Sequence, residues 1–279
     1  MRGASADALA ALSDALGQAV SFESGEGPRL APIESRADLT ALRKTLDLGR
    51  LEPVFETLDR VRSSLIDDVA LIGFCGAPWT VASYMVAGRG TSDQAPARLF
   101  AYRQPALFSE LIMLLVEASA DYLVRQLRAG AQAVQIFDSW AGVLPVAELE
   151  RWCLAPLRAL VAKVRAHAPD APIIAFPRGA GAALTAFAGI DGLAAISLDT
   201  AVAPAWAAAA LPRGLALQGN LDPLALLAGG EGLDEGVDRI LEDFAGAPHI
   251  FNLGHGILPE TPIEHVERLV ARVRGRSKG

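Results

Sequence analysis

The sequence has few cysteines, and this shortage argues against a disulfide scaffold or a cysteine-rich metal site. Its two cysteines, Cys75 and Cys153, lie far apart and form no CxxC pair. We therefore expect two reduced thiols that pack as small hydrophobic side chains. None of the four histidines stands at a ligand-like spacing from these thiols, so the sequence predicts no metal site.

Long apolar runs and an excess of basic residues are also missing. The longest aliphatic runs, such as Leu111–Val116, are much shorter than the roughly 20 residues of a membrane-spanning helix. Asp7 and Asp14 interrupt the segment where a signal peptide needs an apolar core, so we expect a cytoplasmic protein. The net charge of −7 argues against nucleic acid as a partner. An anionic small molecule is not excluded, because arginines gathered in one cleft can outweigh acidic charges that salt screens beyond roughly 10 Å.

The chain does contain short β-rich runs that alternate with longer helical patterns. Six nearly continuous apolar runs are typical of strands buried on both faces: Val69–Cys75, Ala133–Phe137, Pro172–Phe176, Ala194–Leu198, Leu215–Gly219 and His249–Leu253. Helical patterns cover Thr80–Val86, Ala106–Ala129, Glu148–His167, Leu221–Leu227, Gly232–Phe244 and Ile263–Arg274. Val20–Pro32 predicts two short strands around a Gly-rich turn. This alternation predicts right-handed crossovers and a parallel sheet.

Both a closed barrel and a doubly wound open sheet fit this pattern. Almost every predicted strand is followed by a polar or Gly/Pro cluster, such as Asp138-Ser139, Pro177-Arg178, Asp199 and Asn252–His255. A site built from most strand ends is typical of a barrel, whereas an open sheet binds its ligand at one switch point. We therefore predict a single (β/α)8 barrel domain over residues 1–279, because no Pro-, Gly- or Ser-rich linker divides the chain.

Three of these segments carry candidate site residues. Tyr84 follows the Gly-rich turn in GFCGAPWTVASYMVAGRG, where free helix N–H groups could bind an anion. A tyrosine in such a place is, by itself, more often a half-buried packing residue. Asp138 and Ser139 end the strand in QIFDSWAG and either face a pocket or cap the following turn. His255 stands between Gly254 and Gly256, which leave its imidazole open to close approach.

Taken together, six segments resemble the uroporphyrinogen decarboxylase family in order and spacing. They read ALGQAVSF, GEGPRL, GFCGAPWT followed by SYMV, QIFDSWAG, LQGNLDP and NLGHGILPETP, and the match runs from about Ala15 to the C-terminus. The resemblance implies a cofactor-free (β/α)8 barrel that usually forms a homodimer. It also implies removal of four carboxyl groups as CO₂ from the acetate side chains of uroporphyrinogen III, which gives coproporphyrinogen III. By the same resemblance Tyr84, Ser139 and His255 line the substrate cavity, and His255 contacts a substrate carboxylate.

The N-terminal part of the sequence departs from this pattern. The family has a segment similar to RQAGRYxPEY, whose arginines bind the substrate carboxylates, and the sequence contains no such segment. The family's catalytic aspartate lies on the first barrel strand, and counting back from Gly17 places that position at Ala8. Asp7 is one residue away, and a one-residue slip on a strand reverses the direction of the side chain. The alanine-rich surroundings also favour a helix over a strand.

These departures lead us to expect an N-terminally truncated or altered member with weak or absent activity. In the family the aspartate stabilises a cationic pyrrole intermediate, and losing such a preorganised charge costs several kcal/mol. Four arginines could compensate in part, although we expect each at the surface: Arg29, Arg89, Arg103 and Arg178. Ala87, where relatives usually have Glu, is a smaller departure.

Two other functions stay open at this stage. A zinc-dependent corrinoid or thiol methyltransferase shares the barrel, but its His-x-Cys pair and distant cysteine have no counterpart in LQGNLDP or NLGHGILP. A non-catalytic barrel that binds porphyrin-like anions, or that pairs with a full-length subunit, is the other alternative. Porphyrinogen binding without release of CO₂ would distinguish it from the enzyme.

Overall fold

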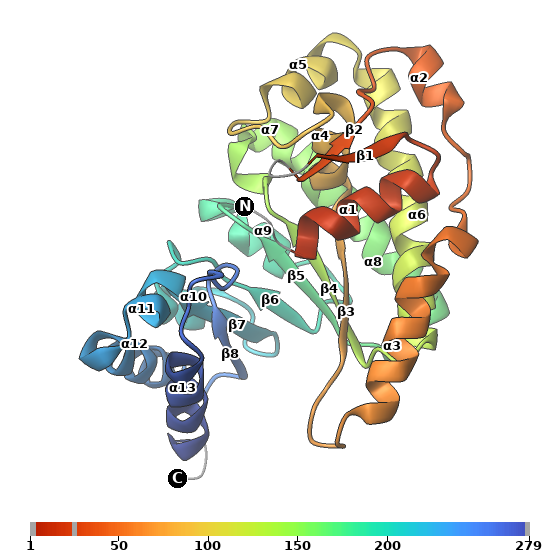
Figure 1. Cartoon of the computed structure of the whole chain (residues 1–279). Coiled ribbons are helices and arrows are strands. Elements are labelled where there is room, and N and C mark those ends of the chain that lie inside the picture. The colour runs from red at the N-terminus through yellow and green to blue at the C-terminus, as the bar shows by residue number, and fades with distance from the viewer. Residues whose placement is uncertain (1–3, 24–26, 277–279) are drawn as a thin grey trace.

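A parallel sheet organises the chain in the computed structural model, which describes residues 4–23 and 27–276. Its strands run in the order β3-β4-β5-β6-β7-β8, each paired in parallel with the next along the chain (Figure 1). Their bounds are β3 Ile72–Gly76, β4 Ala133–Asp138, β5 Ile173–Pro177, β6 Ala195–Ser197, β7 Ala216–Leu221 and β8 His249–Leu253. All six predicted strands are confirmed, and the fold is an α/β fold of the (β/α)8-barrel type, of which the described residues form six parallel strands.

Helices connect the strands and cover the sheet. Before β3 lie α1 Ala4–Ala15, α2 Arg36–Ala41 and α3 Glu52–Ser64, and the later helices are α4 Pro78–Ala87, α5 Ala95–Arg103, α6 Pro105–Arg128, α7 Val146–Leu149, α8 Ala155–His167, α9 Leu184–Ala188, α10 Pro204–Ala210, α11 Pro223–Ala228, α12 Gly230–Asp243 and α13 Ile263–Arg276. The predicted strand pair is present as the antiparallel strands β1 Val20–Glu23 and β2 Gly27–Leu30. No helix within the described residues is long and apolar enough to cross a membrane.

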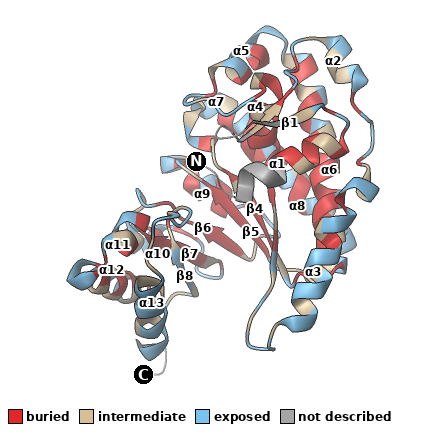
Figure 2. Cartoon of the chain, viewed as in Figure 1, coloured by how far each residue is buried: buried red, intermediate tan, exposed pale blue. Residues whose placement is uncertain are grey.

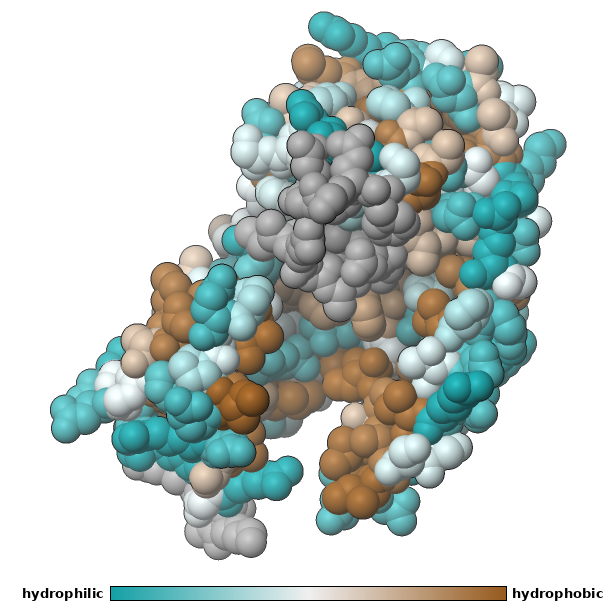
Figure 3. All heavy atoms as spheres, in the orientation of Figure 1, coloured by the Kyte–Doolittle hydropathy of each residue, from teal (hydrophilic) through white to brown (hydrophobic). Residues whose placement is uncertain are grey.

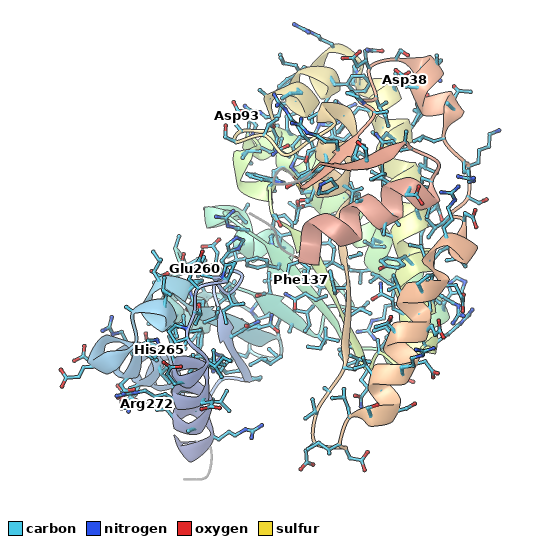
Figure 4. The ribbon with its side chains drawn as sticks, viewed as in Figure 1. Asp38, Asp93, Phe137, Glu260, His265 and Arg272 are labelled. Atoms are coloured by element: carbon cyan, nitrogen blue, oxygen red, sulfur yellow. The ribbon has the colours of Figure 1, made fainter. Side chains whose placement is uncertain are left out.

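The buried core follows the central strands and the helices packed on them. Figure 2 shows β4, β5 and β6 buried, whereas the outer faces of α3, α12 and α13 are exposed. Inside the curved sheet, Phe137 of β4 stacks edge-on against Phe74 of β3 and Phe176 of β5, with both pairs of ring centroids 5.9 Å apart (Figure 4). Deeper in the interior, the Gln218 amide donates to Gln135 Oε1 at 3.3 Å and to Ser197 Oγ at 3.1 Å. A contact between β7 and β4, which are not neighbours in the sheet, shows that the sheet curves strongly.

The sheet has two edge strands, because no other described strand pairs with β3 or with β8 on its second side. Ile72 of β3 and Ile250 of β8 are 42% and 41% exposed. Figure 3 shows apolar surface facing the hollow between the part that carries α3 and β3 and the part that carries β8 and α13. Ion pairs hold this second part together, with Arg272 bidentate on Asp238 between α13 and α12 (Figure 4).

A glutamine side chain takes the place of a neighbouring strand at the edge of β3. Gln126 of α6 is 2% exposed, and its amide both accepts from Phe74 N–H and donates to the Phe74 carbonyl, each at 2.9 Å. Gly73 makes room for this contact, since a Cβ there would lie 2.7 Å from Gln126 Oε1. The side chain thus satisfies two backbone groups that would otherwise lack partners at this edge.

Replacing Gln126 by Met is expected to lower the free energy of unfolding by about 2–3 kcal/mol, because Phe74 loses both partners in a part-buried setting. The matched control is Gln132→Met, since Gln132 accepts from Leu71 N–H of the same chain segment but in an exposed position. We expect that change to cost about 0.5 kcal/mol or less. Urea unfolding of both variants measures the difference; equal losses would show that Gln126 does not protect the edge.

Candidate functional site

Polar side chains gather where the parallel strands end. The register pairs Asp138 with Pro177 and Asn220 with Asn252, so the carboxyl ends of neighbouring strands share one edge of the sheet. A cavity of about 290 Å³ opens there, lined by Ser139, Trp140, Gly142, Val143, Arg178, Gly179, Asp199, Thr200 and Ala201. These residues come from the loops after β4, β5 and β6. Loops at this end of the strands are where (β/α)8 enzymes bind their ligands.

A close backbone contact joins the loop after β4 to the loop after β5. A Cβ on Gly142 would lie 2.5 Å from the carbonyl oxygen of Gly179, so only glycine fits there. Gly142 N–H donates to the Arg178 carbonyl at 3.1 Å, and Arg178 N–H donates to the Asp138 carbonyl at 3.0 Å. Arg178 is therefore fixed beside Ser139, and both line the cavity.

A second close contact joins the loop after β8 to the loop after β6. A Cβ on Gly254 would lie 2.6 Å from Thr200 N and 3.0 Å from the carbonyl carbon of Asp199. Gly254 N–H also donates to the Leu221 carbonyl at 2.8 Å, which ties the loop to the end of β7. Gly256, on the other side of His255, has nothing near its Cβ position. Of the two glycines that flank the histidine, Gly254 is the one that packing requires.

His255 is half-buried and within electrostatic reach of two charged residues of the cavity. Burial lowers the pKa of its imidazole below the ordinary value, and the positive charge of Arg178 lowers it further. The carboxylate of Asp199 opposes both effects and raises this pKa. The neutral imidazole is therefore favoured near pH 7 when no anion is bound, and an added carboxylate would favour its protonation.

Asp138 connects β4 to α4. It is 3% exposed, and its Oδ1 accepts from Thr80 Oγ1 at 2.7 Å. Burial raises the pKa of this carboxyl to about 6, although hydrogen bonds from Thr80, the Cys153 thiol and the Trp140 backbone oppose the rise. Of the adjacent pair Asp138 and Ser139, the first is therefore a buried link to the helix and the second lines the cavity.

Tyr84 lies on α4, one helical turn after Thr80, at the same end of the sheet. Its side chain is half-buried against the core, and its hydroxyl lies 3.2 Å from the position that a Cβ of Gly90 would take. Trp79 Nε1 donates to the Trp140 carbonyl at 3.0 Å, so α4 is also tied to the loop after Ser139. Ser139 lines the cavity, and His255 lies near it because Gly254 packs on Thr200 and because Arg178 and Asp199 act on the imidazole. Neither His255 nor Tyr84 is among the residues that line this cavity.

The candidate arginines occupy different positions from one another. Arg178 is half-buried and lines the cavity, so the expectation of a surface role is wrong for this residue. Arg89 and Arg103 are exposed, and Arg29 is half-buried on β2. Sequence reasoning also missed Asp199 as a site residue, although its place directly after a predicted strand was the available signal.

The N-terminal segment is helical, and the two thiols are buried. Asp7 and Ala8 both lie on α1, which confirms that this segment is a helix; the structure describes its backbone but not these two side chains. Cys75 and Cys153 are buried and unpaired, as predicted. Burial raises the pKa of the Cys75 thiol to about 12, and burial together with Asp138 raises that of Cys153. Within the described residues, no three His, Cys, Asp or Glu side chains converge as metal ligands would.

Comparisons with known proteins agree with this architecture. The family model described as "Uroporphyrinogen decarboxylase (URO-D)" matches residues 6–276. The uroporphyrinogen decarboxylase of Rhizorhabdus wittichii is 56% identical over 261 residues, which cover 94% of this chain and 75% of the relative. That of Sphingopyxis alaskensis is 52% identical over 261 residues, which cover 94% of this chain and 76% of the relative.

Solved structures extend the comparison to the fold. A methyltransferase from Methanosarcina mazei superposes with a TM-score of 0.75 at 21% identity, covering 96% of this chain and 78% of that one. A B12-independent methionine synthase from Shewanella sp. W3-18-1 gives a TM-score of 0.59 at 11% identity, covering 94% and 74%. At such identities the likeness shows a shared fold and no shared chemistry. The family match over nearly the whole length, together with relatives that share more than half of their aligned residues with it, shows that this chain belongs to the uroporphyrinogen decarboxylase family.

Proposed function

We propose that this chain decarboxylates the acetate side chains of uroporphyrinogen III to give coproporphyrinogen III in tetrapyrrole biosynthesis. One observation carries the proposal beyond family membership: a cavity at the carboxyl ends of the strands has Arg178 in its lining and His255 within electrostatic reach. A guanidinium and an imidazole within electrostatic reach of each other suit a substrate rich in carboxylates. Ser139 adds a hydroxyl that can donate to a carboxylate oxygen.

In this reaction the protein binds and orients the substrate and forms no covalent bond to it. In each cycle a pyrrole ring takes up a proton, the bond from the acetate methylene to its carboxylate breaks, and the electron pair moves into the ring. CO₂ leaves, protonation of the methylene carbon gives a methyl group, and the ring releases the proton that it took up, so each cycle consumes one net proton per CO₂. We assign Arg178 and His255 to holding carboxylates that are not reacting and Ser139 to orienting one of them. By the family resemblance we also assign Tyr84 to the lining of the substrate cavity. No cofactor is required.

We further propose that this chain turns over more slowly than its relatives. By the resemblance, the position that corresponds to the family's aspartate is Ala8, with Asp7 one residue away, and both lie on α1; we infer that the cationic pyrrole lacks the charge that the family uses to stabilise it. Loss of one such preorganised group reduces turnover by about 10²–10³-fold. A cytoplasmic homodimer is a further proposal from the resemblance, and light scattering of the purified chain tests the dimer.

The test is anaerobic incubation of the purified chain with uroporphyrinogen III, with the R. wittichii relative assayed in parallel. Chromatography separates products that retain seven, six, five and four carboxyl groups. We expect the same products as the relative forms, at a much lower rate. A rate near that of the relative would contradict the slow-turnover proposal. No product where the relative forms it would contradict the decarboxylase proposal, and tight porphyrinogen binding in that case would favour the non-catalytic alternative.

The charge state of His255 makes substrate binding dependent on pH. The pKa of His255 is lowered in the free protein, and a bound carboxylate favours the protonated form, so binding takes up a proton. Affinity for uroporphyrin, the oxidised analogue, is therefore expected to rise as the pH falls from about 8 to about 6. Fluorescence titration at several pH values measures this dependence.

The variant His255→Gln should bind more weakly and should lose most of this dependence. The control is His167→Gln, because His167 is exposed at the end of α8, with its ring bonded to the Lys163 carbonyl. An unchanged pH dependence in the His255 variant would mean that another group takes up the proton.

A further inference from the structure

Asp199 places a buried carboxylate in the cavity lining beside Arg178 and within electrostatic reach of His255. It lies two residues after the end of β6, is 9% exposed and lines the cavity with Arg178. Both of its oxygens accept backbone N–H groups: Oδ2 from Gly179 at 2.6 Å and Oδ1 from Ala201 at 2.8 Å. A single carboxylate therefore joins the loop after β5 to the loop after β6.

The first of these bonds fixes the peptide unit that carries Arg178. Gly179 N–H belongs to the peptide bond after Arg178, and the carbonyl of that same peptide accepts from Gly142 N–H at 3.1 Å. The peptide is thus held from both sides, by the carboxylate on one and by the loop after β4 on the other. The direction in which the Arg178 side chain leaves the backbone is set by this clamp.

The second bond stabilises the surface on which the histidine loop rests. Gly254 packs against Thr200 N and the carbonyl carbon of Asp199, within the turn that the Asp199 carboxylate closes onto Ala201. Asn220 supports the same turn from β7 by donating to the carbonyls of Asp199 and Val202, each at 2.7 Å. This backbone support does not depend on the Asp199 side chain, so the turn should persist when only the carboxylate is changed.

We propose that Asp199 is a positioning residue: its carboxylate sets the spacing between Arg178 and His255 and balances their charges, so that together they accept two neighbouring carboxylates of one ligand. The inference rests on the proposed function for the identity of that ligand. The arrangement of Arg178, Asp199 and His255 is independent of the proposed function. Arg178 and Asp199 are the described charged groups that act on His255, and they act in opposite directions.

The experiment follows the imidazole signals of the whole chain by NMR as a function of pH. The chain has four histidines, so the resonance of His255 can be assigned from the His255→Gln variant. In Asp199→Asn the pKa of His255 is expected to fall by about half a unit or more, because the opposing negative charge is gone. The KM for uroporphyrinogen is expected to rise about tenfold or more, with kcat changing less than about threefold.

Asp222→Asn is the matched control. Asp222 is exposed at the same end of the sheet, and its carboxylate also accepts a backbone N–H, from Leu224 at 2.9 Å. This variant should leave both the His255 pKa and KM unchanged. An unchanged His255 pKa in Asp199→Asn, or an equal change in Asp222→Asn, overturns the proposal. Because the NMR readout needs no substrate, this outcome is distinct from a failure of the decarboxylase assignment.

A second variant keeps the proposal testable if Asp199→Asn does not fold. Arg178→Met removes the positive charge that acts on His255, so the pKa of His255 is expected to rise by about half a unit or more. An unchanged pKa there would show that the two groups are not held at interacting distance, and the positioning role would be refuted.

Discussion

Replacing Arg178 by Met is expected to lower kcat/KM for uroporphyrinogen by about 100-fold, equivalent to about 3 kcal/mol. Met keeps most of the apolar stem of the side chain but removes the guanidinium of this half-buried residue, which lines the cavity. A charge-assisted bond to a carboxylate is worth about 1.5–3 kcal/mol, and a part-buried carboxylate left without its partner adds a further cost. The effect should fall mainly on KM, because the same contact exists before and during the reaction.

Two further variants sharpen the test of Arg178. Arg178→Lys keeps the charge but loses the planar fork, so an intermediate loss is expected. Arg89→Met is the control, because Arg89 follows α4 near Tyr84 but is exposed, and its loss should change kcat/KM less than about twofold. Steady-state kinetics of the Arg178→Met, Arg178→Lys and Arg89→Met variants measure these differences in kcat/KM. If kcat/KM of the Arg178→Met variant stays within about threefold of that of the unmodified chain, Arg178 does not bind the substrate.

Placing a methyl group on Gly254 is expected to lower kcat/KM by about 100-fold or more, whereas the same change at Gly256 should have almost no effect. The Cβ of Gly254→Ala would lie 2.6 Å from Thr200 N, a backbone atom that cannot move without shifting the loop after β6. The loop that carries His255 must therefore retreat from Asp199. Displacements of about 1 Å in a binding constellation commonly cost about two orders of magnitude in rate.

The two variants add the same methyl group on either side of His255, so a difference between them comes from the surroundings of each glycine. Gly254 and Gly256 flank the same histidine, yet the Cβ position of Gly256 has no neighbour within 4 Å. Thermal unfolding of both variants shows whether the loss at Gly254 comes from the site or from the fold, and we expect only a modest drop in Tm for Gly254→Ala. Similar kinetics for the two variants would mean that the contact with Thr200 does not position His255.

Much of the fold could be predicted from local pattern. The six strands are continuous apolar runs bounded by Gly, Pro or polar residues, and this pattern is typical of a sheet buried on both faces. The helix over Ala4–Ala15 could be predicted as well, because alanine favours helix over strand. The amide of Gln126 at the edge of β3 could not, because its partner Phe74 lies 52 residues earlier in the sequence and no local signal connects the two.

The site was predictable only in part, for the same reason. Ser139 and His255 could be named because they follow strands and stand in motifs that resemble a known family. Arg178 looked like one more surface arginine, since nothing in Pro177-Arg178-Gly179 shows that Gly142 packs against the backbone there. Asp199 was visible as a polar strand end, but its bonds to Gly179 and Ala201 depend on the separation of two loops in space.

A crystal structure of the chain with uroporphyrin bound tests the central claim most directly. The account predicts the tetrapyrrole at the carboxyl ends of the strands, with one peripheral carboxylate on the Arg178 guanidinium, a neighbouring one on the His255 imidazole, and Ser139 within hydrogen-bond distance of either. Electron density for the ligand elsewhere would contradict it, for example in the apolar groove of about 250 Å³ between β3, α3 and α6 that Val54, Leu58 and Tyr122 help to line.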